Sequence, residues 1–385
     1  MSKPKKSLWW VAGWFPSRQH FLAGDFIARH AELAAEVAEI RLFHFPLWME
    51  GEPRPEPLNQ PEHWVLEWHP VRQKKGGAWA RFWNANAYQK TVLAILEKAY
   101  REHQPDGVHV HAPDKTAAPL ARFLHGKTVP LFLTEHWAIY DGQASDAIEK
   151  RAWWFRRAQA QLWKRVDLHL SISQALHGDM QRYFGRQKPM LALPNVVNQG
   201  LFYPHEREGV AVFLHVSGMD ERKNPKGILR AFSAFRTAQP EAQLCMLGAD
   251  SSEILGWAQS QGLAESVQFI GACPQAEVAV HMRQALALVL FSFSENAPCV
   301  ISEALCSGVP VLSTSVGAIP EMLPTPEEGL LLPVADQAAL TRAFEQAWTL
   351  YKGEGAAARR SRAQRAVARY GPAAVAAALE RGYGL

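Results

Sequence analysis

The chain has 385 residues, of which 48% are apolar by type and 20% are charged, with 26 Gly and 25 Pro. This composition excludes a disordered or collagen-like protein and allows a large core. The length predicts two domains. Residues 1–200 hold 12 of the 14 Trp and 26 basic against 19 acidic side chains, whereas residues 201–385 hold 15 basic against 18 acidic. The first half is therefore the basic and aromatic one.

Simple counts exclude several classes of protein. A net charge of +4, with no basic stripe or recognition motif, argues against a nucleic-acid partner. The cysteines form no CxxC pair, which fits a reducing compartment and argues against zinc; they are Cys245, Cys273, Cys299 and Cys306. The apolar run near the start is too short for a signal peptide, and no stretch approaches the roughly 20 apolar residues of a membrane span. We expect a cytoplasmic protein that could lie peripherally on the cytoplasmic face of the membrane.

Short apolar runs alternate with longer amphipathic stretches along the whole chain, a rhythm typical of βαβ units with parallel sheets. In the first half, the expected strands are Ser7–Ala12, Ala38–Phe43, Gly107–His111, Pro130–Thr134, Asp167–Ile172 and Leu191–Leu193. Helices are expected between them, for example at Asp25–Val37 and Trp83–Glu102.

The second half repeats this rhythm after a boundary near Pro194–Pro204. Its expected strands are Val210–Val216, Gln243–Leu247, Val267–Ile270, Ala287–Leu290 and Val309–Thr314, and its expected helices include Pro225–Ala238 and Val300–Cys306. The tail from Arg359 reads as helical with a break at Gly371-Pro372. The sequence thus predicts an α/β fold of two doubly wound domains facing across a cleft, with ligands at the carboxyl ends of the strands. No GxGxxG follows a strand, so a dinucleotide oxidoreductase has no support.

The most informative segment runs from the end of a buried strand at Ser292 to Val311. Glu295 lies on the loop that enters a helix, where backbone N–H groups can bind a diphosphate. Glu303 lies about one turn into the helix, where its carboxylate could accept hydrogen bonds from a diol. Two glutamates at this spacing could instead form a solvated helix face. Apolar neighbours make a free carboxylate at Glu303 costly, which favours a paired one.

This segment resembles the donor-site signature of retaining GT-B glycosyltransferases of family four: a glutamate, seven residues, a second glutamate and then Gly-x-Pro-Val. Further pieces occur in that family's order: Gly13-Trp-Phe-Pro-Ser, Gly24-Asp-Phe-Ile, Val108-His-Val-His, Leu133-Thr-Glu-His136, Ser173-Gln-Ala-Leu, Leu193-Pro-Asn-Val, His215-Val-Ser-Gly-Met-Asp-Glu-Arg-Lys-Asn-Pro, Phe269-Ile-Gly and Gly317-Ala-Ile-Pro-Glu321. Each piece is weak alone, but their order and spacing together are specific.

The resemblance implies a role for each matching residue. Glu303 would bind the ribose of a nucleotide sugar, and Glu295 would contact sugar hydroxyls near the reacting carbon. Lys223 would neutralise the diphosphate, Gly24 would let the first loop approach the phosphates, and His136 would lie near the transferred sugar.

The resemblance also implies that the chain is divided into three parts. Residues 1–198 would be an acceptor-binding Rossmann-like domain, and residues 205–365 a donor-binding one. Residues 366–385 would form a helix that crosses back to the first domain.

One position departs from the family pattern. The family usually has an arginine five residues before the lysine, and here that position is Gly218. Arg222 could supply the missing charge or point into solvent. Lys223 and the helix start at Asn296, Ala297 and Pro298 would stabilise the negative charge that develops on the leaving diphosphate. Because no DxD-type acidic pair follows a strand, we expect catalysis without a bound divalent metal.

Two weaker signals remain. His109 and His111 share one side of a strand and could form a metal pair, but no third ligand is evident, so ordinary polar contacts are expected. Two basic aromatic stretches, Arg72–Trp83 and Arg151–Arg157, could touch an anionic membrane or stack on acceptor sugars. Their Trp residues could equally be buried in the core.

The function expected from these signals is a retaining sugar transfer in cell-surface polysaccharide or glycolipid synthesis. The donor would be a nucleotide sugar of the UDP or GDP type, the acceptor a glycan or a lipid-linked glycan, and no cofactor is needed. Two alternatives stay open: a catalytically silent nucleotide-sugar-binding protein, motivated by Gly218, and a nucleotide-sugar epimerase of similar two-domain build.

Overall fold

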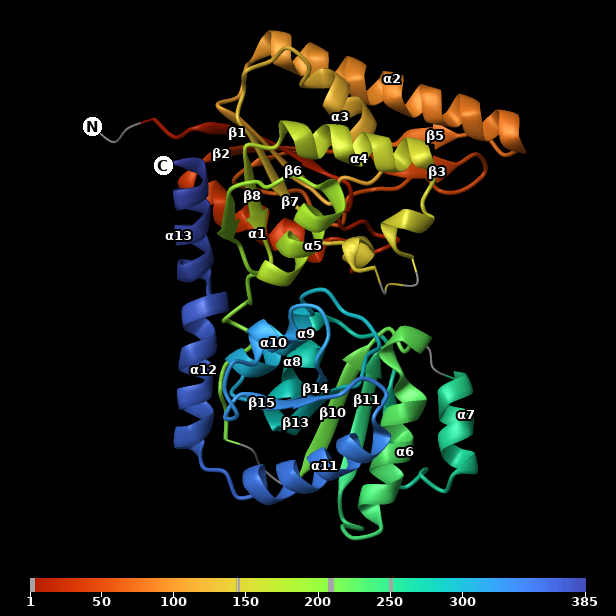
Figure 1. Ribbon diagram of the computed structural model, residues 1–385, viewed down its shortest axis with the longest axis vertical. Coiled ribbons are helices and arrows are strands. Elements are labelled where there is room, and N and C mark those ends of the chain that lie inside the picture. The colour runs from red at the N-terminus through yellow and green to blue at the C-terminus, as the bar shows by residue number, and fades with distance from the viewer. Residues whose placement is uncertain (1–3, 143, 145, 207–210, 249–251) are drawn as a thin grey trace. The chain divides into compact units, whose positions relative to one another are not determined.

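The computed structural model describes residues 4–142, 144, 146–206, 211–248 and 252–385. The chain divides into two compact units: unit 1 is Met1–Val196 with Val375–Leu385, and unit 2 is Val197–Ala374. Figure 1 shows a sheet layered between helices in each unit. The end of the chain therefore belongs to the same compact unit as its beginning.

Unit 1 is built on a parallel sheet whose strand order is β4-β2-β1-β6-β7-β8-β9 in the described residues, with β3 and β5 paired separately. The strands are β1 (Ser7–Ala12), β2 (Glu39–His44), β3 (Leu47–Met49), β4 (Val65–Trp68), β5 (Val71–Gln73), β6 (Gly107–His111), β7 (Leu131–Thr134), β8 (Leu168–Ser171) and β9 (Met190–Ala192). The helices are α1 (Asp25–Val37), α2 (Ala78–Glu102), α3 (Ala117–Phe123), α4 (Trp153–Arg165), α5 (Gln174–Phe184) and α13 (Pro372–Tyr383), with 3-10 turns η1 (Ala138–Tyr140) and η2 (Ile148–Lys150).

Strand β1 is buried on both faces, which explains its continuous apolar sequence. The Trp9 ring packs edge-on against Tyr100 and stacks on Phe123, on the face covered by α2 and α3. Trp10, one residue later, points to the opposite face and packs against His109. Figure 1 shows α2, α3 and α4 on one side of this sheet and α1 on the other.

The last helix, α13, is part of the unit 1 core. Val375 and Leu379 are fully buried in the cluster that also contains Trp10. The Tyr383 hydroxyl lies 2.6 Å from Nδ1 of His109, and Lys6 Nζ donates to the Tyr383 carbonyl at 2.8 Å. These contacts join the two ends of the described chain.

Unit 2 is a second parallel sheet, of order β12-β11-β10-β13-β14-β15 within the described ranges. Its strands are β10 (Val212–Ser217), β11 (Gln243–Gly248), β12 (Val267–Ile270), β13 (Ala285–Leu290), β14 (Val311–Thr314) and β15 (Gly329–Leu332). Its helices are η3 (Glu221–Lys223), α6 (Pro225–Arg236), α7 (Ser252–Ser260), α8 (Gln275–Gln284), α9 (Cys299–Cys306), α10 (Ile319–Met322), α11 (Gln337–Tyr351) and α12 (Ala356–Tyr370). Helices α6, α7 and α11 share one core cluster, and α8, α9 and α12 share another.

The observed elements confirm most of the expected order. The strands at Ser7–Ala12, Gly107–His111 and Val267–Ile270 and the helix Asp25–Val37 have the predicted bounds. Val210, where one strand was expected to begin, lies outside the described residues. Strands β3, β4, β5 and β15 were not expected, because runs of three or four residues carry too little period-two pattern to separate them from loops.

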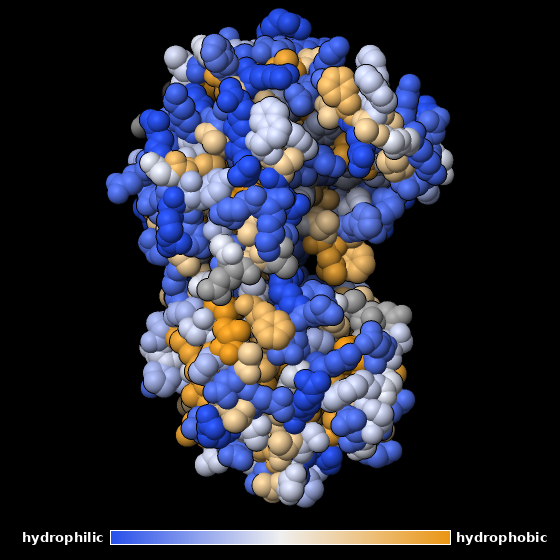
Figure 2. All heavy atoms as spheres, turned by 45° about the vertical axis from the view of Figure 1, so that its right-hand side comes forward, coloured by the Kyte–Doolittle hydropathy of each residue, from blue (hydrophilic) through white to orange (hydrophobic). Residues whose placement is uncertain are grey.

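The visible surface of the protein is largely hydrophilic (Figure 2). On the face shown in Figure 2, apolar side chains form separate patches within a largely hydrophilic surface. Within the described residues, no helix is both long and apolar enough to cross a bilayer.

Candidate functional site

The strands of unit 2 run parallel, so their carboxyl ends share one edge of the sheet, and the predicted donor residues lie on the loops that leave it. After β10, Asp220 accepts a hydrogen bond from the N–H of Arg222 at 3.0 Å. Asn224, with a φ of 51°, accepts from the N–H of Gly227 at 3.1 Å and caps α6. The segment thus folds as two consecutive side-chain caps that fix Lys223 between them.

Lys223 and Glu295 meet, although 72 residues separate them. The Lys223 Nζ and Glu295 Oε1 atoms are 2.6 Å apart, and their side chains are only 15% and 5% exposed. Ser292 Oγ donates to the same carboxylate oxygen at 2.7 Å. The N–H of Phe293 also donates to the Arg222 carbonyl at 2.8 Å, so the loops after β10 and β13 are joined by backbone and side chain.

A third strand end holds the Glu295 loop in place. Thr314, at the end of β14, donates its hydroxyl to the Ser292 carbonyl at 2.7 Å, and the N–H of Ala318 donates to the Asn296 carbonyl at 2.9 Å. Gly317 has a φ of 53°, and a Cβ there would lie 2.1 Å from the Glu295 carbonyl oxygen. Only glycine fits this approach, which explains the glycine that opens the Gly-Ala-Ile-Pro segment after the strand.

Glu303 is buried within α9 at 7% exposure, so the solvated helix face considered from the sequence is wrong. Its Oε1 accepts a hydrogen bond of 2.9 Å from Nε2 of Gln275, the first residue of α8. Helix α9 begins at Cys299, and in the described chain its N-cap residue, Pro298, makes no side-chain hydrogen bond to cap the helix. The carboxylate is therefore oriented by a neighbouring helix.

Gly218, where the family usually has an arginine, and Arg222, which could supply the missing charge, both lie on the surface. Gly218 is exposed, and the atom nearest to a Cβ built there is Asp220 Oδ2 at 3.7 Å, so the site has room for a side chain. Arg222 is 46% exposed, with its Nε 3.6 Å from Asp220 Oδ1. Arg222 is thus paired with a surface carboxylate, in contrast to the buried pair of Lys223.

Gly24 and His136 belong to unit 1. Gly24 precedes α1 with a φ of 72°, and a Cβ would lie 2.7 Å from the Trp14 carbonyl group, so the glycine is required by the loop itself. His136 follows β7, and Glu135 Oε1 accepts from the N–H groups of His136 and Trp137 at 2.8 and 2.9 Å. Burial raises the pKa of Glu135 to about 7.

Burial also lowers the pKa of His136 well below its ordinary value, with a further contribution from the charge of His30. Its ring packs on Phe26, with centroids 4.3 Å apart, and lies parallel to His111 within 15° at 5.8 Å. His136 is therefore a neutral imidazole near pH 7.

The prediction of ordinary polar contacts is confirmed for His109 and wrong for His111. The His109 ring nitrogens lie 2.6 Å from Tyr383 Oη and 2.8 Å from Thr134 Oγ1. Neither ring nitrogen of His111 has a hydrogen-bond partner in the described part of the chain, because this ring is enclosed by Trp10 and other aromatic rings.

Unit 1 also contains a cavity of about 420 Å³. Its walls come from the start of α2, the loop after β6 and the start of α4, and they include Arg81, Tyr88, Asp114 and Trp154. Burial raises the pKa of Asp114 to about 6. A buried carboxyl with a raised pKa in a cavity is a candidate for substrate binding.

The basic aromatic stretches are at the surface, so burial of their Trp residues in the core is wrong. Trp79 and Trp83, at the start of α2, are 79% and 64% exposed, and Trp153 and Trp154, at the start of α4, are 69% and 58% exposed. Asn84 holds the preceding loop through hydrogen bonds of 3.0 and 2.9 Å with the backbone of Lys74.

The sequence did not reveal Gln275, Ser292, Thr314 or Asp114 as parts of these sites. Gln275 and Thr314 act through contacts with Glu303 and Ser292, which are 28 and 22 positions away in sequence. Asp114, Ser292 and Thr314 had a usable signal, since each lies at or just after the end of a predicted strand.

Comparisons with known proteins agree with this geometry. Residues 202–365 match the family model of glycosyl transferases group 1, and residues 32–200 match that of Glycosyltransferase Family 4. The two matches adjoin and span most of the chain. The chain belongs to the GT-B glycosyltransferases of family four.

One relative by sequence and two solved structures are similar to this chain. The N-acetyl-alpha-D-glucosaminyl L-malate synthase of Bacillus anthracis is 25% identical over 275 residues, which are 68% of each chain. The lipopolysaccharide outer core galactosyltransferase WaaB shares the fold, with a TM-score of 0.69, 14% identity and coverage of 97% of this chain and 98% of that one. Anabaena HepE in complex with UDP-glucose has a TM-score of 0.70 at 14% identity and the same coverage.

Proposed function

We propose that this glycosyltransferase moves a sugar from a nucleoside diphosphate donor to a glycan or lipid-linked acceptor, with retention of anomeric configuration, in polysaccharide or glycolipid synthesis. The observation that carries the proposal is the buried pair of Lys223 and Glu295. Breaking the sugar–phosphate bond puts negative charge on the diphosphate and positive charge on the sugar ring. A cation and a carboxylate held on adjoining loops match these two charges.

The donor would bind along the loops after β10 and β13. Lys223 would turn from Glu295 toward the diphosphate, and Glu295 would then be released for the sugar hydroxyls. Glu303, oriented by Gln275, would accept from the ribose diol. We expect a UDP-sugar first, because the HepE structure contains UDP-glucose, and a GDP-sugar as the alternative. The leaving group would be stabilised by Lys223 and the start of α9, with no metal on the diphosphate.

The acceptor would bind to unit 1, in the cavity of about 420 Å³ that contains Asp114 and Tyr88. Asp114 offers hydrogen bonds to sugar hydroxyls, and the aromatic wall offers stacking. Lys74, Arg81 and Trp154 line this cavity and belong to the basic aromatic surface. A lipid-linked acceptor would therefore reach the cavity from an anionic membrane on which exposed Trp side chains rest.

Thermal stability against a panel of UDP, GDP, ADP and their sugars tests the donor proposal. A ligand at 100 times its Kd adds about 2.7 kcal/mol of stability, so the correct nucleotide stands out. Glu295→Ala should keep binding to the nucleotide alone but lose release of nucleotide from the sugar donor. Stabilisation by none of the nucleotides would contradict the proposal.

A sedimentation assay with liposomes tests the membrane proposal. Vesicles that contain anionic phosphatidylglycerol should pull down the protein at low salt, and 1 M salt should release it because charge contacts are screened. The double variant Trp79→Ser with Trp83→Ser should sediment less, whereas Trp163→Phe, a buried control, should sediment like the unchanged protein. Equal sedimentation with neutral and anionic vesicles would contradict the proposal.

One observation favours a second function, a catalytically silent nucleotide-sugar-binding protein: the position of the family arginine is the exposed Gly218. Stabilisation by a nucleotide sugar without any release of nucleotide, in the presence of acceptor extracts, would support it. An epimerase would instead release an altered nucleotide sugar, which product analysis by chromatography distinguishes.

A further inference from the structure

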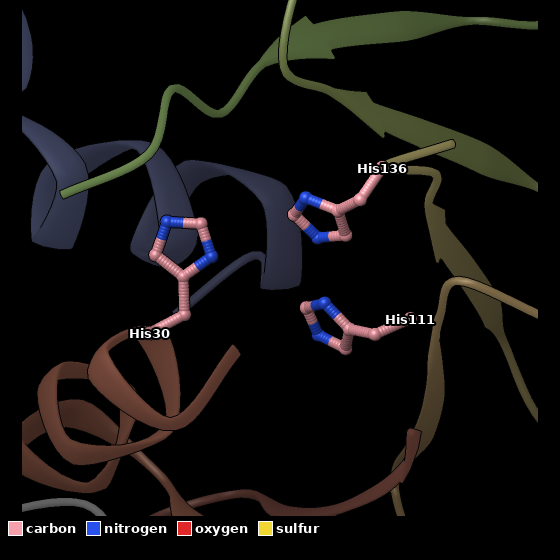
Figure 3. Close-up of side chains that lie close together, drawn as sticks. All are labelled: His30, His111 and His136. Atoms are coloured by element: carbon pink, nitrogen blue, oxygen red, sulfur yellow. The ribbon is translucent and has the colours of Figure 1, made fainter. Parts of the chain in front are cut away.

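Three histidines of unit 1 converge from three separate elements. His30 comes from α1, His111 is the last residue of β6, and His136 follows β7. One ring nitrogen of each lies within 4.8 Å of the others. Figure 3 shows the His111 and His136 rings side by side with the His30 ring turned toward them. Because β6 and β7 are neighbouring parallel strands, the sheet brings two of these side chains to one edge and α1 supplies the third.

The hydrogen bonds of His30 leave one of its nitrogens suited to a metal. Its Nε2 lies 3.0 Å from the Pro194 carbonyl oxygen, which can only accept, so Nε2 carries the proton and Nδ1 keeps its lone pair. In the described residues His30 Nδ1 has no hydrogen-bond partner. An imidazole that donates one N–H to a backbone carbonyl and presents the other nitrogen is the usual arrangement of a metal-binding histidine.

His111 provides the second observation. Its ring is fully buried, and neither ring nitrogen has a hydrogen-bond partner within the described chain. Its neighbour His109, equally buried, has partners at both nitrogens. Buried polar groups are nearly always hydrogen-bonded, so His111 is an exception that a bound ion would resolve.

We propose that His30, His111 and His136 bind one divalent transition metal ion, with Zn²⁺ the best match. Three imidazoles without a carboxylate suit Zn²⁺ and similar ions and do not suit Mg²⁺ or Ca²⁺. Zn–N bonds of about 2.0–2.1 Å place the three nitrogens about 3.3 Å apart, so the ion would draw together ring nitrogens that now lie within 4.8 Å of one another. A three-histidine site leaves one coordination position for water or a substrate oxygen. The ion would also fix α1 against the ends of β6 and β7.

This proposal differs from the sequence-based expectation of no metal site. That expectation considered the His109–His111 pair, whereas in the structure both His109 ring nitrogens are hydrogen-bonded and His111 clusters with His30 and His136. All three histidines belong to unit 1, whereas the lysine and the two glutamates of the proposed donor site belong to unit 2.

The test uses untagged full-length protein, stripped with a chelator and then given ZnCl₂. We expect about one bound Zn²⁺ per chain, a higher unfolding temperature with zinc, and, after substitution with Co²⁺, visible absorption bands of a low-symmetry nitrogen site. His111→Gln should weaken zinc affinity by at least about 100-fold, more than loss of an outer-shell partner does. His109→Gln is the matched control, since it changes an equally buried histidine on the same strand and leaves all three ligands.

Several outcomes would overturn the proposal. The unchanged protein could bind Zn²⁺ no more tightly than His111→Gln, or His109→Gln could lose zinc as fully as His111→Gln while folded. If His111→Gln does not fold, X-ray absorption of the zinc-loaded unchanged protein decides the question. Imidazole scattering from three histidines at about 2.0 Å is expected, and a shell of cysteine sulfur or carboxylate oxygen would reject the site.

Discussion

Replacing Lys223 by alanine is the most direct test of the proposed chemistry. The lysine is 15% exposed and its partner Glu295 is 5% exposed, with 2.6 Å between Nζ and Oε1. Removing one partner of a buried pair costs about 3–5 kcal/mol, because the other charge stays buried. Lys223 is partly exposed, and Glu295 keeps its hydrogen bond from Ser292. The loss of stability in Lys223→Ala should therefore lie near the lower end of this range.

The effect on turnover has a separate origin. A lost charge-stabilising donor costs about 2–4 kcal/mol in the transition state, which lowers kcat/KM by roughly 30- to 1000-fold. The assay is release of nucleotide from the donor that gives the largest thermal shift, measured well below the unfolding temperature of the variant.

A double variant separates stability from catalysis. Lys223→Ala combined with Glu295→Gln removes the unpaired buried charge, so urea unfolding should show part of the stability restored, while turnover stays low. Lys226→Ala is the matched control: its 2.7 Å pair with Glu253 is exposed at 38% and 82%, so stability and turnover should stay near those of the unchanged protein. Full turnover by Lys223→Ala would refute the leaving-group role.

Three further predictions follow from local features. In urea unfolding, Gly24→Ala should destabilise unit 1 by more than about 1–2 kcal/mol, because a left-handed backbone and the close Trp14 carbonyl both oppose a Cβ. The control Gly126→Ala, with a φ of 75° and open space around its Cβ position, should lose less stability. Equal losses of stability in the two variants would contradict the steric argument. The pKa of Asp114 is raised from 3.8 to about 6, so the folded state holds the proton more tightly and this group's stabilisation, complete below about pH 4, is lost as pH rises through 6. Asp114→Asn should therefore gain stability relative to the unchanged protein between pH 4 and about 7 in urea titrations, and a pH-independent difference would be evidence against the shift. Adding Mg²⁺ or Mn²⁺ to chelator-treated protein should leave the rate of sugar transfer unchanged, and a strong activation would show that the diphosphate needs a metal.

The sequence alone determined the order of elements and the position of the donor loops. The strand Ser7–Ala12 was predictable because a strand buried on both faces needs a continuous apolar run, which Leu8 to Ala12 provide. The glutamate spacing and the glycine-rich turns were also readable, since they are local. The short strands β3, β4, β5 and β15 were not, because their few residues gain stability from pairing with neighbours and not from their own pattern.

Tertiary structure decided which side chains meet. Lys223 pairs with Glu295, Glu303 with Gln275, and His30 approaches His111 and His136 only because parallel strands bring the ends of distant segments to one sheet edge. Exposure was equally undetermined: the buried Trp9 and the exposed Trp79 are the same residue type, and their surroundings separate them. Local sequence fixes backbone preference within a few residues, whereas contact between distant residues depends on how the whole sheet packs.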